Sequence, residues 1–461
     1  MSERPAEEKR AETDGIDLGM LLIALLSVLL MVMFWYRGWT LAFLVAQTAV
    51  ISIVLWQACD PFAEAAQWVG RTYRLPGSVR GATLDAIASS LPELFSGIFF
   101  VIVMAASSTD QRAMAESVGE GYGSTIATCA GSAIYNMILI PGVCALVISL
   151  RRPSRPAIDV EHDAVWRDGL FFLVCEALLL YFLFQDTMHW WMGAAFVALY
   201  VLYIAKLHRD ARAYRRHFDA VKQVLDEMGL DTPWRDAKRA LADRGIKVDR
   251  GTVARIKQAL RQGHGGGESE DDEGAVNTAR VFFHCCRVPL NRGSAWGLLA
   301  AATGVAAVAC YFLVEAVYAT AEELSVAPFF VAVILAAAAS SLPDMFLSIG
   351  AARRGDDSGA ISNAFGSNIF DICICLSLPL LLACFLNGWQ PISLLQDGKP
   401  MAGLVGLRML LWVLTLITLF IIWHKRRVTR TKGVILCGLY CVFIAYAVLG
   451  SLGVSFFGYS L

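Results

Sequence analysis

Charged residues are scarce in this chain, which argues against an ordinary soluble protein. Asp, Glu, Lys and Arg make up 17% of the 461 residues, while 57% of the residues are hydrophobic. Soluble domains average about 25% charged and about 45–50% apolar residues. The net charge is −1, so the overall balance of charge predicts neither a basic nor an acidic partner.

The signatures of common metal centres and enzymes are also missing. The twelve cysteines form no pair of C-x-x-C motifs, and most stand singly inside apolar stretches. Small buried apolar side chains explain them better than a disulfide framework or a zinc site. We find no nucleotide-binding loop and no nucleophile–base pair, so we do not expect an enzyme. The one long polar stretch is too short for the phosphorylation domain of an ion pump.

What the sequence does have is long hydrophobic runs. A helix needs about 20 apolar residues to cross about 30 Å of hydrocarbon, and each run reaches that length. We therefore predict an all-α membrane protein with ten core transmembrane helices and one extra N-terminal helix. The runs lie near residues 18–36, 40–68, 77–105, 121–150, 165–185, 188–207, 294–320, 326–351, 358–386, 402–424 and 433–457.

Polar stretches between the runs divide the chain into five parts. We expect a cytoplasmic tail at 1–16, the extra helix at 17–36, a five-helix repeat at 38–207, a cytoplasmic loop domain at 208–291 and a second five-helix repeat at 292–461. The loop domain should hold a charged helix, two short helices around a glycine turn and a flexible acidic linker. Its basic face favours packing or regulation near anionic lipid over nucleic-acid binding. A monomer is expected, with the bilayer and transported cations as partners.

Lysine and arginine predict the orientation. If the N-terminus is cytoplasmic and each run crosses once, all but four of the 39 basic residues lie on the cytoplasmic side. The exceptions are Arg37, Arg112, Lys399 and Arg408. Basic residues in short loops favour the cytoplasmic side of a membrane. We predict a multi-pass protein of a plasma or inner membrane, with the central loop in the cytoplasm.

An internal repeat singles out two segments of the chain. The first reads AIASSLPELFSG at 86–97 and GSAIYN at 131–136, and the second reads AAASSLPDMFLS at 337–348 and GSNIFD at 366–371. The second copy lies on the fifth predicted crossing after that of the first, so the two should run in opposite directions through the membrane. This arrangement predicts inverted repeats, which in transporters place the binding site near the bilayer midplane.

Each copy places a carboxylate directly after a proline in an apolar run. Pro92 and Pro343 lack a backbone donor and leave carbonyls one turn earlier without a partner. Glu93 and Asp344 follow directly, although a charge at this depth costs about 2.5–3.5 kcal/mol or more. One such motif alone could be a proline-kinked helix with a protonated carboxyl group. Two at mirrored positions predict a paired site.

The ligand chemistry of the motifs is that of hard cations. They offer carboxylates, hydroxyls and carbonyls, and no histidine or cysteine belongs to either copy. Such oxygen ligands suit Ca²⁺, Mg²⁺ or Na⁺ better than soft metals.

The two segments resemble the α-repeats of the cation/Ca²⁺ exchanger superfamily, which contains the sodium/calcium exchangers. The resemblance covers most of the chain, and GSAIYN, Pro-Asp and GSNIFD make it most similar to the potassium-dependent sodium/calcium branch. The Gly-Asn-Ala-Thr-Glu signature of the proton/calcium branch is absent.

The resemblance implies roles for particular residues. Glu93 and Asp344 would be the central Ca²⁺ ligands, shared with Na⁺ in the alternate state, and the shorter Asp344 leaves the ion preference open. The other ligands implied are the carbonyls of Ser89, Ser340, Ala86 and Ala337, the hydroxyls of Ser90, Ser132, Ser341 and Ser367, and the side chains of Asn136 and Asp371.

The function expected from these features is secondary active antiport of Ca²⁺ against Na⁺ by alternating access, with K⁺ co-transport left open. With Asp371 ionised the site would carry −3, which Ca²⁺ plus K⁺ or three Na⁺ would neutralise, so Asp371 is expected to tune K⁺ dependence. A proton-coupled Ca²⁺ or Mg²⁺ antiporter is the alternative. A channel or receptor would keep the helices but would not need broken helices in inverted symmetry.

Overall fold

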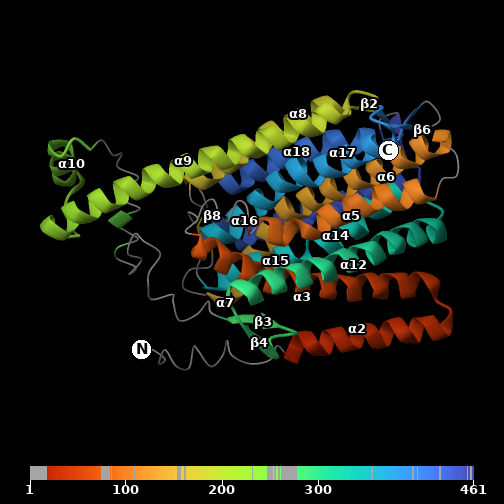
Figure 1. The fold of residues 1–461 in the computed structure, drawn as a ribbon, viewed down its shortest axis with the longest axis horizontal. Helices are drawn as coiled ribbons and strands as arrows, with labels where there is room; N and C mark the ends of the chain where they lie inside the picture. Colours follow the sequence, from red (N-terminus) through yellow and green to blue (C-terminus); the bar gives the residue numbers. More distant parts are fainter. Residues whose placement is uncertain are drawn as a thin grey trace.

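The structure is a computed structural model in which a long bundle of helices carries a helical arm at one end (Figure 1). It describes residues 18–73, 84, 86–107, 111–152, 157–159, 162–230, 232–246, 253, 256–257, 260, 278–354, 357–396, 399–401, 403–424, 427–453, 455–456 and 459–460. The expected N-terminal tail and acidic linker lie outside these residues, as does most of the second short helix of the loop domain.

The first half of the chain forms helices close to the predicted runs. They are α2 (Leu18–Arg37), α3 (Thr40–Thr72), α5 (Ala86–Ala106), α6 (Gln111–Ile134), η2 (Tyr135–Leu139), α7 (Ile140–Arg151), α8 (His162–Leu183), α9 (Trp190–Met228) and α10 (Trp234–Asp243). Here η denotes a π-helical segment.

The second half follows the same plan with more interruptions. Its helices are α12 (Arg292–Leu324), α13 (Pro328–Val331), η4 (Ala332–Ala336), α14 (Ala337–Ser340), α15 (Leu342–Arg354), α16 (Asp357–Phe370), η5 (Asp371–Cys375), α17 (Ser377–Leu386), α18 (Leu404–Trp423) and α19 (Arg430–Ser451).

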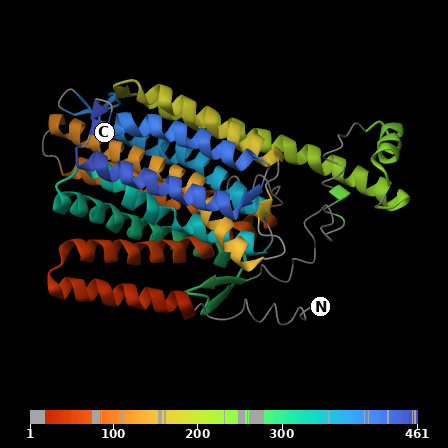
Figure 2. The same cartoon turned by 180° about the vertical axis from the view of Figure 1, so that it is seen from behind.

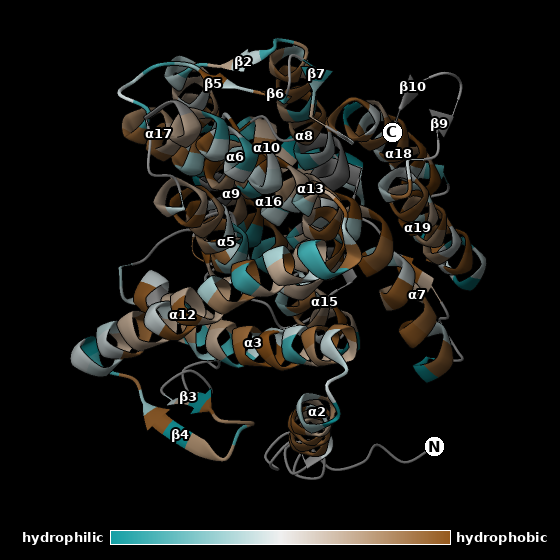
Figure 3. Ribbon diagram, turned by 90° about the vertical axis from the view of Figure 1, so that its right-hand side faces the viewer, coloured by the Kyte–Doolittle hydropathy of each residue, from teal (hydrophilic) through white to brown (hydrophobic). Residues whose placement is uncertain are grey.

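Ten helical stretches in the described part are long and apolar enough to cross a membrane. One predicted run, at 165–185, has no counterpart among these ten. It corresponds to α8, which is helical over His162–Leu183. In the view along the bundle, hydrophobic residues dominate the peripheral helices α2, α18 and α19 (Figure 3). Helix α2 lies beside α3, and the protein buries no residue of its most apolar 18-residue stretch. The side chains of this stretch can therefore face lipid.

The loop domain differs from its prediction in two ways. The charged helix expected at 209–229 does not begin anew, because α9 continues from the predicted span to Met228 as one helix of 39 residues. A β-hairpin of β3 (Thr278–Val281) and β4 (Cys286–Pro289), which we did not predict, precedes α12. The expected glycine turn is present, since Gly245 has a φ of 75° after α10.

Short antiparallel pairs join the connections between helices. β1 (Ala157–Asp159) pairs with β8 (Arg427–Thr429), and β2 (Thr187–Met188) pairs with β5 (Ile392–Ser393). The remaining pairs are β6 (Leu395–Gln396) with β7 (Lys399–Pro400), and β9 (Ser455–Phe456) with β10 (Tyr459–Ser460).

The interior of the bundle combines an apolar core with a buried polar centre. Figure 2 shows the bundle from behind, with the helices of both halves interleaved. One large hydrophobic cluster includes side chains of α5, α6, α16 and α17, and Tyr122 and Phe100 are among its largest fully buried members. Glu93 on α5, Asp344 on α15 and Asp371 on η5 are each 0% exposed. The fold therefore buries three carboxyl groups where apolar side chains would be the ordinary choice.

Candidate functional site

The two Ser-Ser-Leu-Pro-acid motifs lie on α5 and on the α14–α15 pair. In the second copy the helix breaks as predicted: α14 ends at Ser340, Ser341 has φ −86° and ψ −1°, and α15 begins at Leu342. In the first copy Pro92 stands inside α5, six residues after its start at Ala86. The predicted break is thus confirmed in the second half, whereas the described part of α5 continues through its proline.

Glu93 lies where the two motif copies meet. Its Oε1 accepts hydrogen bonds from the hydroxyl of Ser132 on α6, at 3.1 Å, and from the hydroxyl of Ser341 in the second copy, at 3.2 Å. The two hydroxyls are themselves 2.8 Å apart. A carboxylate of the first half is therefore held by one hydroxyl from each half.

Asp344 has the complementary position in the second half. Its Oδ2 accepts from Asn136 Nδ2 on η2 at 3.0 Å, and its Oδ1 accepts from the Ser367 hydroxyl on α16 at 3.0 Å. The Ser367 and Ser89 hydroxyls are 3.0 Å apart, which links Asp344 back to the first motif. Each motif carboxylate is thus contacted by a Gly-Ser-x-Ile segment of the chain.

Asp371 joins the same network through Ser132, whose hydroxyl lies 3.1 Å from Asp371 Oδ2. A serine hydroxyl has one proton, so Ser132 can donate to Glu93 or to Asp371 but not to both at once. The described side chains therefore supply fewer donors than these carboxylates can accept, which leaves acceptor oxygens for a proton, a cation or water.

The remaining predicted residues lie on the same elements. The Ser340 hydroxyl donates to the Ala337 carbonyl and the Ser89 hydroxyl donates to the Ala86 carbonyl, each at 3.3 Å, so the two motifs repeat this local contact. Ser90 is fully buried. Asn136 Nδ2 donates to the Ser132 hydroxyl at 3.5 Å, which joins the surroundings of Asp344 to those of Glu93. Eight of the twelve predicted residues therefore have side chains in one hydrogen-bonded network, and the Ala86 carbonyl joins it through Ser89. Ser90, Ser340 and Ala337 lie beside it in the motifs.

Several buried oxygen atoms around the network have no hydrogen-bond partner within the described part of the chain. They are Glu93 Oε2, Asp371 Oδ1, Asn136 Oδ1, Asn368 Oδ1 and Ser90 Oγ. A buried polar atom without a partner costs about 1–3 kcal/mol, and more if it is charged. Carboxylate, amide and hydroxyl oxygens gathered in this way match the donor set that Ca²⁺ and Na⁺ require.

Carboxylates alone do not complete such a site. In the residues that the structure describes, no group of three His, Cys, Asp or Glu side chains is placed to hold a metal ion. Hydroxyl, amide and carbonyl oxygens must therefore supply part of any coordination shell, as the sequence predicts.

A close helix crossing brings the two halves together. A Cβ on Gly131 would lie 2.3 Å from the Val333 carbonyl oxygen and 2.7 Å from Ala337 Cβ, so only glycine permits this approach of α6 to η4 and α14. Ser132, the next residue, thereby reaches both Glu93 and Ser341.

Some site features escaped the sequence prediction. Asn363 on α16 donates to Asp344 Oδ1 at 3.3 Å and to the Ser348 hydroxyl at 3.3 Å, but neither residue lies in the Gly-Ser motif. The π-helical segments η2 and η5 begin at the ends of the two Gly-Ser motifs and carry Asn136 and Asp371. Such segments are frequent at functional sites, yet no residue type marks them in a sequence.

Comparison with known proteins identifies a family whose match extends over both halves of the chain. The family described as "Sodium/calcium exchanger protein" matches residues 43–207 and 294–449. The chain is 25% identical to human sodium/potassium/calcium exchanger 5 over 386 residues, which are 76% of this chain and 71% of that protein. It is 34% identical to human sodium/potassium/calcium exchanger 2 over 143 residues, a match that spans 21% of that protein.

Solved structures show the same fold. The crystal structure of the H⁺/Ca²⁺ exchanger CAX superposes with a TM-score of 0.55 at 13% identity, covering 94% of this chain and 93% of that one. The structure of native YfkE gives a TM-score of 0.53 at 14% identity, covering 93% and 99%.

Proposed function

Because the chain belongs to the sodium/calcium exchanger family of multi-pass membrane proteins, we propose that it is an antiporter exchanging Ca²⁺ for Na⁺ by alternating access. The family consists of secondary transporters, which are not enzymes. One observation carries the proposal: Glu93 and Asp344, from separate halves of the chain, share a buried network of oxygen ligands with Asp371. Their uncompensated charge in a bilayer is best explained by bound cations.

Within this proposal, Glu93 and Asp344 are the central ligands of Ca²⁺ and, in the alternate state, of Na⁺. The unpartnered Glu93 Oε2 and Asn136 Oδ1 support this role because they leave acceptors for an ion. The carbonyls of Ser89 and Ser340 complete the Ca²⁺ site. The flanking Na⁺ sites would use the carbonyls of Ala86 and Ala337 and the hydroxyls of Ser90, Ser132, Ser341 and Ser367.

The charge of the cluster bears on the coupling ion. With Glu93, Asp344 and Asp371 ionised, Ca²⁺ plus K⁺ neutralises the site, and so do three Na⁺. Neutral loaded states cross the low-dielectric barrier at the lowest cost. We therefore include K⁺ co-transport through Asp371, in keeping with the names of the two human relatives.

The conformational change would involve α3 and α12. These two long helices lie side by side at one flank of the bundle, against the helices that hold the carboxylates (Figure 1). We propose that the pair slides against this core, that the halves 38–207 and 292–461 are inverted repeats, and that the N-terminus and the 208–291 loop are cytoplasmic.

Ion uptake into proteoliposomes tests the function. Vesicles loaded with Na⁺ should take up Ca²⁺ when diluted into Na⁺-free medium, and Glu93→Gln should abolish this uptake because it removes a central charge. Glu176→Gln is the matched control, since Glu176 is equally buried at 1% exposure but bonds to Thr415, outside the network. The control should keep its transport.

Other outcomes identify other functions. Ca²⁺ or Mg²⁺ uptake driven by a proton gradient, with none driven by Na⁺, would establish the proton-coupled alternative. Ca²⁺ flux without any counterflow of Na⁺ or H⁺ would indicate a channel. Equal transport by Glu93→Gln and the unmodified chain would contradict the proposed site.

A further inference from the structure

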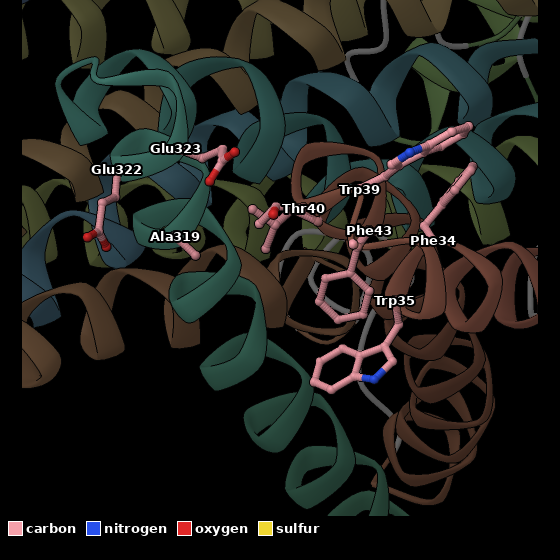
Figure 4. Close-up of a pocket in the computed structure, with 10 residues that line it drawn as sticks. Phe34, Trp35, Trp39, Thr40, Phe43, Ala319, Glu322 and Glu323 are labelled. Carbon is pink, nitrogen blue, oxygen red and sulfur yellow. The ribbon is translucent and has the colours of Figure 1, made fainter.

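A second feature of the molecule lies far from the carboxylate network, where the α2–α3 turn meets the end of α12. A cavity of about 790 Å³ opens there, within the range of about 300–1,000 Å³ that is typical of small-molecule sites. Aromatic and acidic side chains line it: Phe34, Trp35, Trp39, Phe43, Glu322 and Glu323 (Figure 4). None of these belongs to the proposed transport site.

The aromatic wall has a fixed geometry. Gly38, with a φ of 66°, reverses the chain between α2 and α3, so rings from both helices face the same opening. Phe34 and Trp39 stack with centroids 5.8 Å apart, and Trp35 meets Phe43 edge-on at 5.3 Å. Trp35 and Trp39 remain 68% and 56% exposed, so the ring surface that these contacts leave uncovered can touch a ligand.

The opposite wall is electronegative. Glu322 and Glu323 occupy the last turn of α12, which Ser325 ends in a left-handed conformation with a φ of 54°. The C-terminus of a helix carries partial negative charge and favours Lys, Arg or His. This helix has no basic residue in its last turn and two glutamates instead, so a cation would relieve the repulsion.

Within the part of the chain that the structure describes, no cationic side chain lines this cavity. Neither Lys nor Arg is among the lining residues, and Arg37 at the end of α2 is not one of them. The arginine that lies over an aromatic ring in the described residues is Arg408 on α18, 4.9 Å from the centroid of Phe184 just after α8, away from this cavity.

We propose that this cavity binds a substituted ammonium group, such as the trimethylammonium of choline. Aromatic faces attract an organic cation, by about 0.5–2 kcal/mol for each well-placed ring, and quaternary ammonium ions are the usual ligands of such cages. Small inorganic cations keep their water and gain little from indole rings. The group could come from a soluble amine or from a phospholipid headgroup, because tryptophans of this kind lie at membrane interfaces.

Saturation-transfer NMR on the full chain in maltoside micelles tests the proposal without any transport assay. The probes are choline, its uncharged analogue 3,3-dimethyl-1-butanol and dihexanoylphosphatidylcholine. We expect saturable transfer to the trimethyl signal of choline, with the uncharged analogue at least about tenfold weaker. Trp39→Leu should weaken choline binding by about tenfold, and the milder Glu323→Gln by a few-fold. Trp296→Leu, a comparably exposed tryptophan at the other end of α12, should change nothing.

Each outcome has a definite meaning. Trp39-dependent binding of choline identifies a soluble ammonium site, whereas Trp39-dependent binding of the phospholipid alone identifies a headgroup site. Equal binding of the charged and uncharged probes would show an apolar groove and overturn the proposal. Absence of saturable transfer from either cationic probe would overturn it too, as would binding that Trp39→Leu leaves unchanged.

Discussion

Ser132 connects a carboxyl group of the first half of the chain, Glu93, with one of the second half, Asp371. Its hydroxyl lies within 3.1 Å of both Glu93 and Asp371 and 2.8 Å from Ser341. One proton cannot serve all of these acceptors, so the protonation and ion occupancy of the site must be coupled. The consequences for single residues follow from that coupling.

Asp371→Asn tests which ion balances the third carboxylate. The variant removes one negative charge at nearly constant shape, so Ca²⁺ alone should neutralise the remaining pair. We expect Na⁺-driven Ca²⁺ uptake to lose its K⁺ requirement, as measured in proteoliposomes with and without K⁺ on the Ca²⁺ side. If the unmodified chain needs K⁺ and the variant needs it equally, Asp371 does not tune K⁺ dependence.

The equivalent glycines of the two Gly-Ser motifs should respond differently to alanine. Gly131→Ala places a methyl group 2.3 Å from the Val333 carbonyl, while a Cβ on Gly366 meets nothing within 4 Å. Overpacking of this kind costs about 1–3 kcal/mol. We expect Gly131→Ala to lower the thermal unfolding midpoint in detergent and to impair transport.

Gly366→Ala is the matched control and should leave both properties unchanged or raise stability slightly, because alanine favours a helix by about 1 kcal/mol. Equal effects of the two substitutions would show that the α6 crossing is not close in the native protein.

At the scale of elements, the β3–β4 hairpin fastens the end of the 208–291 loop to α3. The Arg280 amide donates to Glu64 Oε2 at 2.6 Å, and the Phe283 amide donates to Gln57 Oε1 at 2.7 Å. Gln57, Asp60 and Glu64 follow one another at helical spacing, so one face of α3 holds the hairpin. Phe282, Phe283 and His284 all have positive φ, and such local strain persists only where surrounding contacts hold it.

This contact should depend on pH through His284. The hydrogen bond to Asp60, with Glu64 nearby, raises the pKa of His284 above its ordinary 6.5, although burial and Arg280 oppose the shift. A raised pKa means that the folded hairpin holds the proton more tightly, so its stabilisation is present below pH 6.5 and is lost as the pH rises through the folded value.

Hydrogen exchange of residues 278–289, corrected for intrinsic rates, should therefore show protection that falls with rising pH. His284→Gln should remove this dependence while leaving Glu64 and Gln57 in place. An unchanged trend in the variant would assign it to another group.

The sequence predicts an element where the interactions that form it are local in the chain. Pro343 marks the break before Asp344 because a missing N–H acts on its own turn, although α5 continues through the equivalent Pro92. The hairpin could not be foreseen, since it is held by Gln57 and Glu64, more than 200 residues earlier. The position of Asn363 beside Asp344 depends on how α16 packs against α15, and no motif encodes it.

At the scale of the whole molecule, the proposed inverted repeat depends on α8 crossing the membrane. The strand before α8, β1, pairs with β8, and the strand after it, β2, pairs with β5. Helix α18 begins beyond β5 and ends before β8, so α8 and α18 connect the same two ends of the bundle in opposite directions. This geometry supports the crossing that the hydrophobic run at 165–185 predicts.

With eleven crossings and a cytoplasmic N-terminus, the hairpin thiols face inward and the α17–β5 connection faces outward. Cys285 and Cys286 are exposed, as is Gln390 in that connection. A membrane-impermeant maleimide should label Gln390→Cys on intact cells, and the hairpin cysteines only after permeabilisation.

The reverse pattern would mean that the whole molecule has the opposite orientation in the membrane. In the proposed topology, α12 to α17 make three crossings between the two positions. Labelling of both positions in intact cells would instead mean an even number of crossings between them, and the inverted repeat would be lost. The two Pro-acid motifs would then no longer enter the site from opposite sides, and alternating access around Glu93 and Asp344 would lose its structural basis.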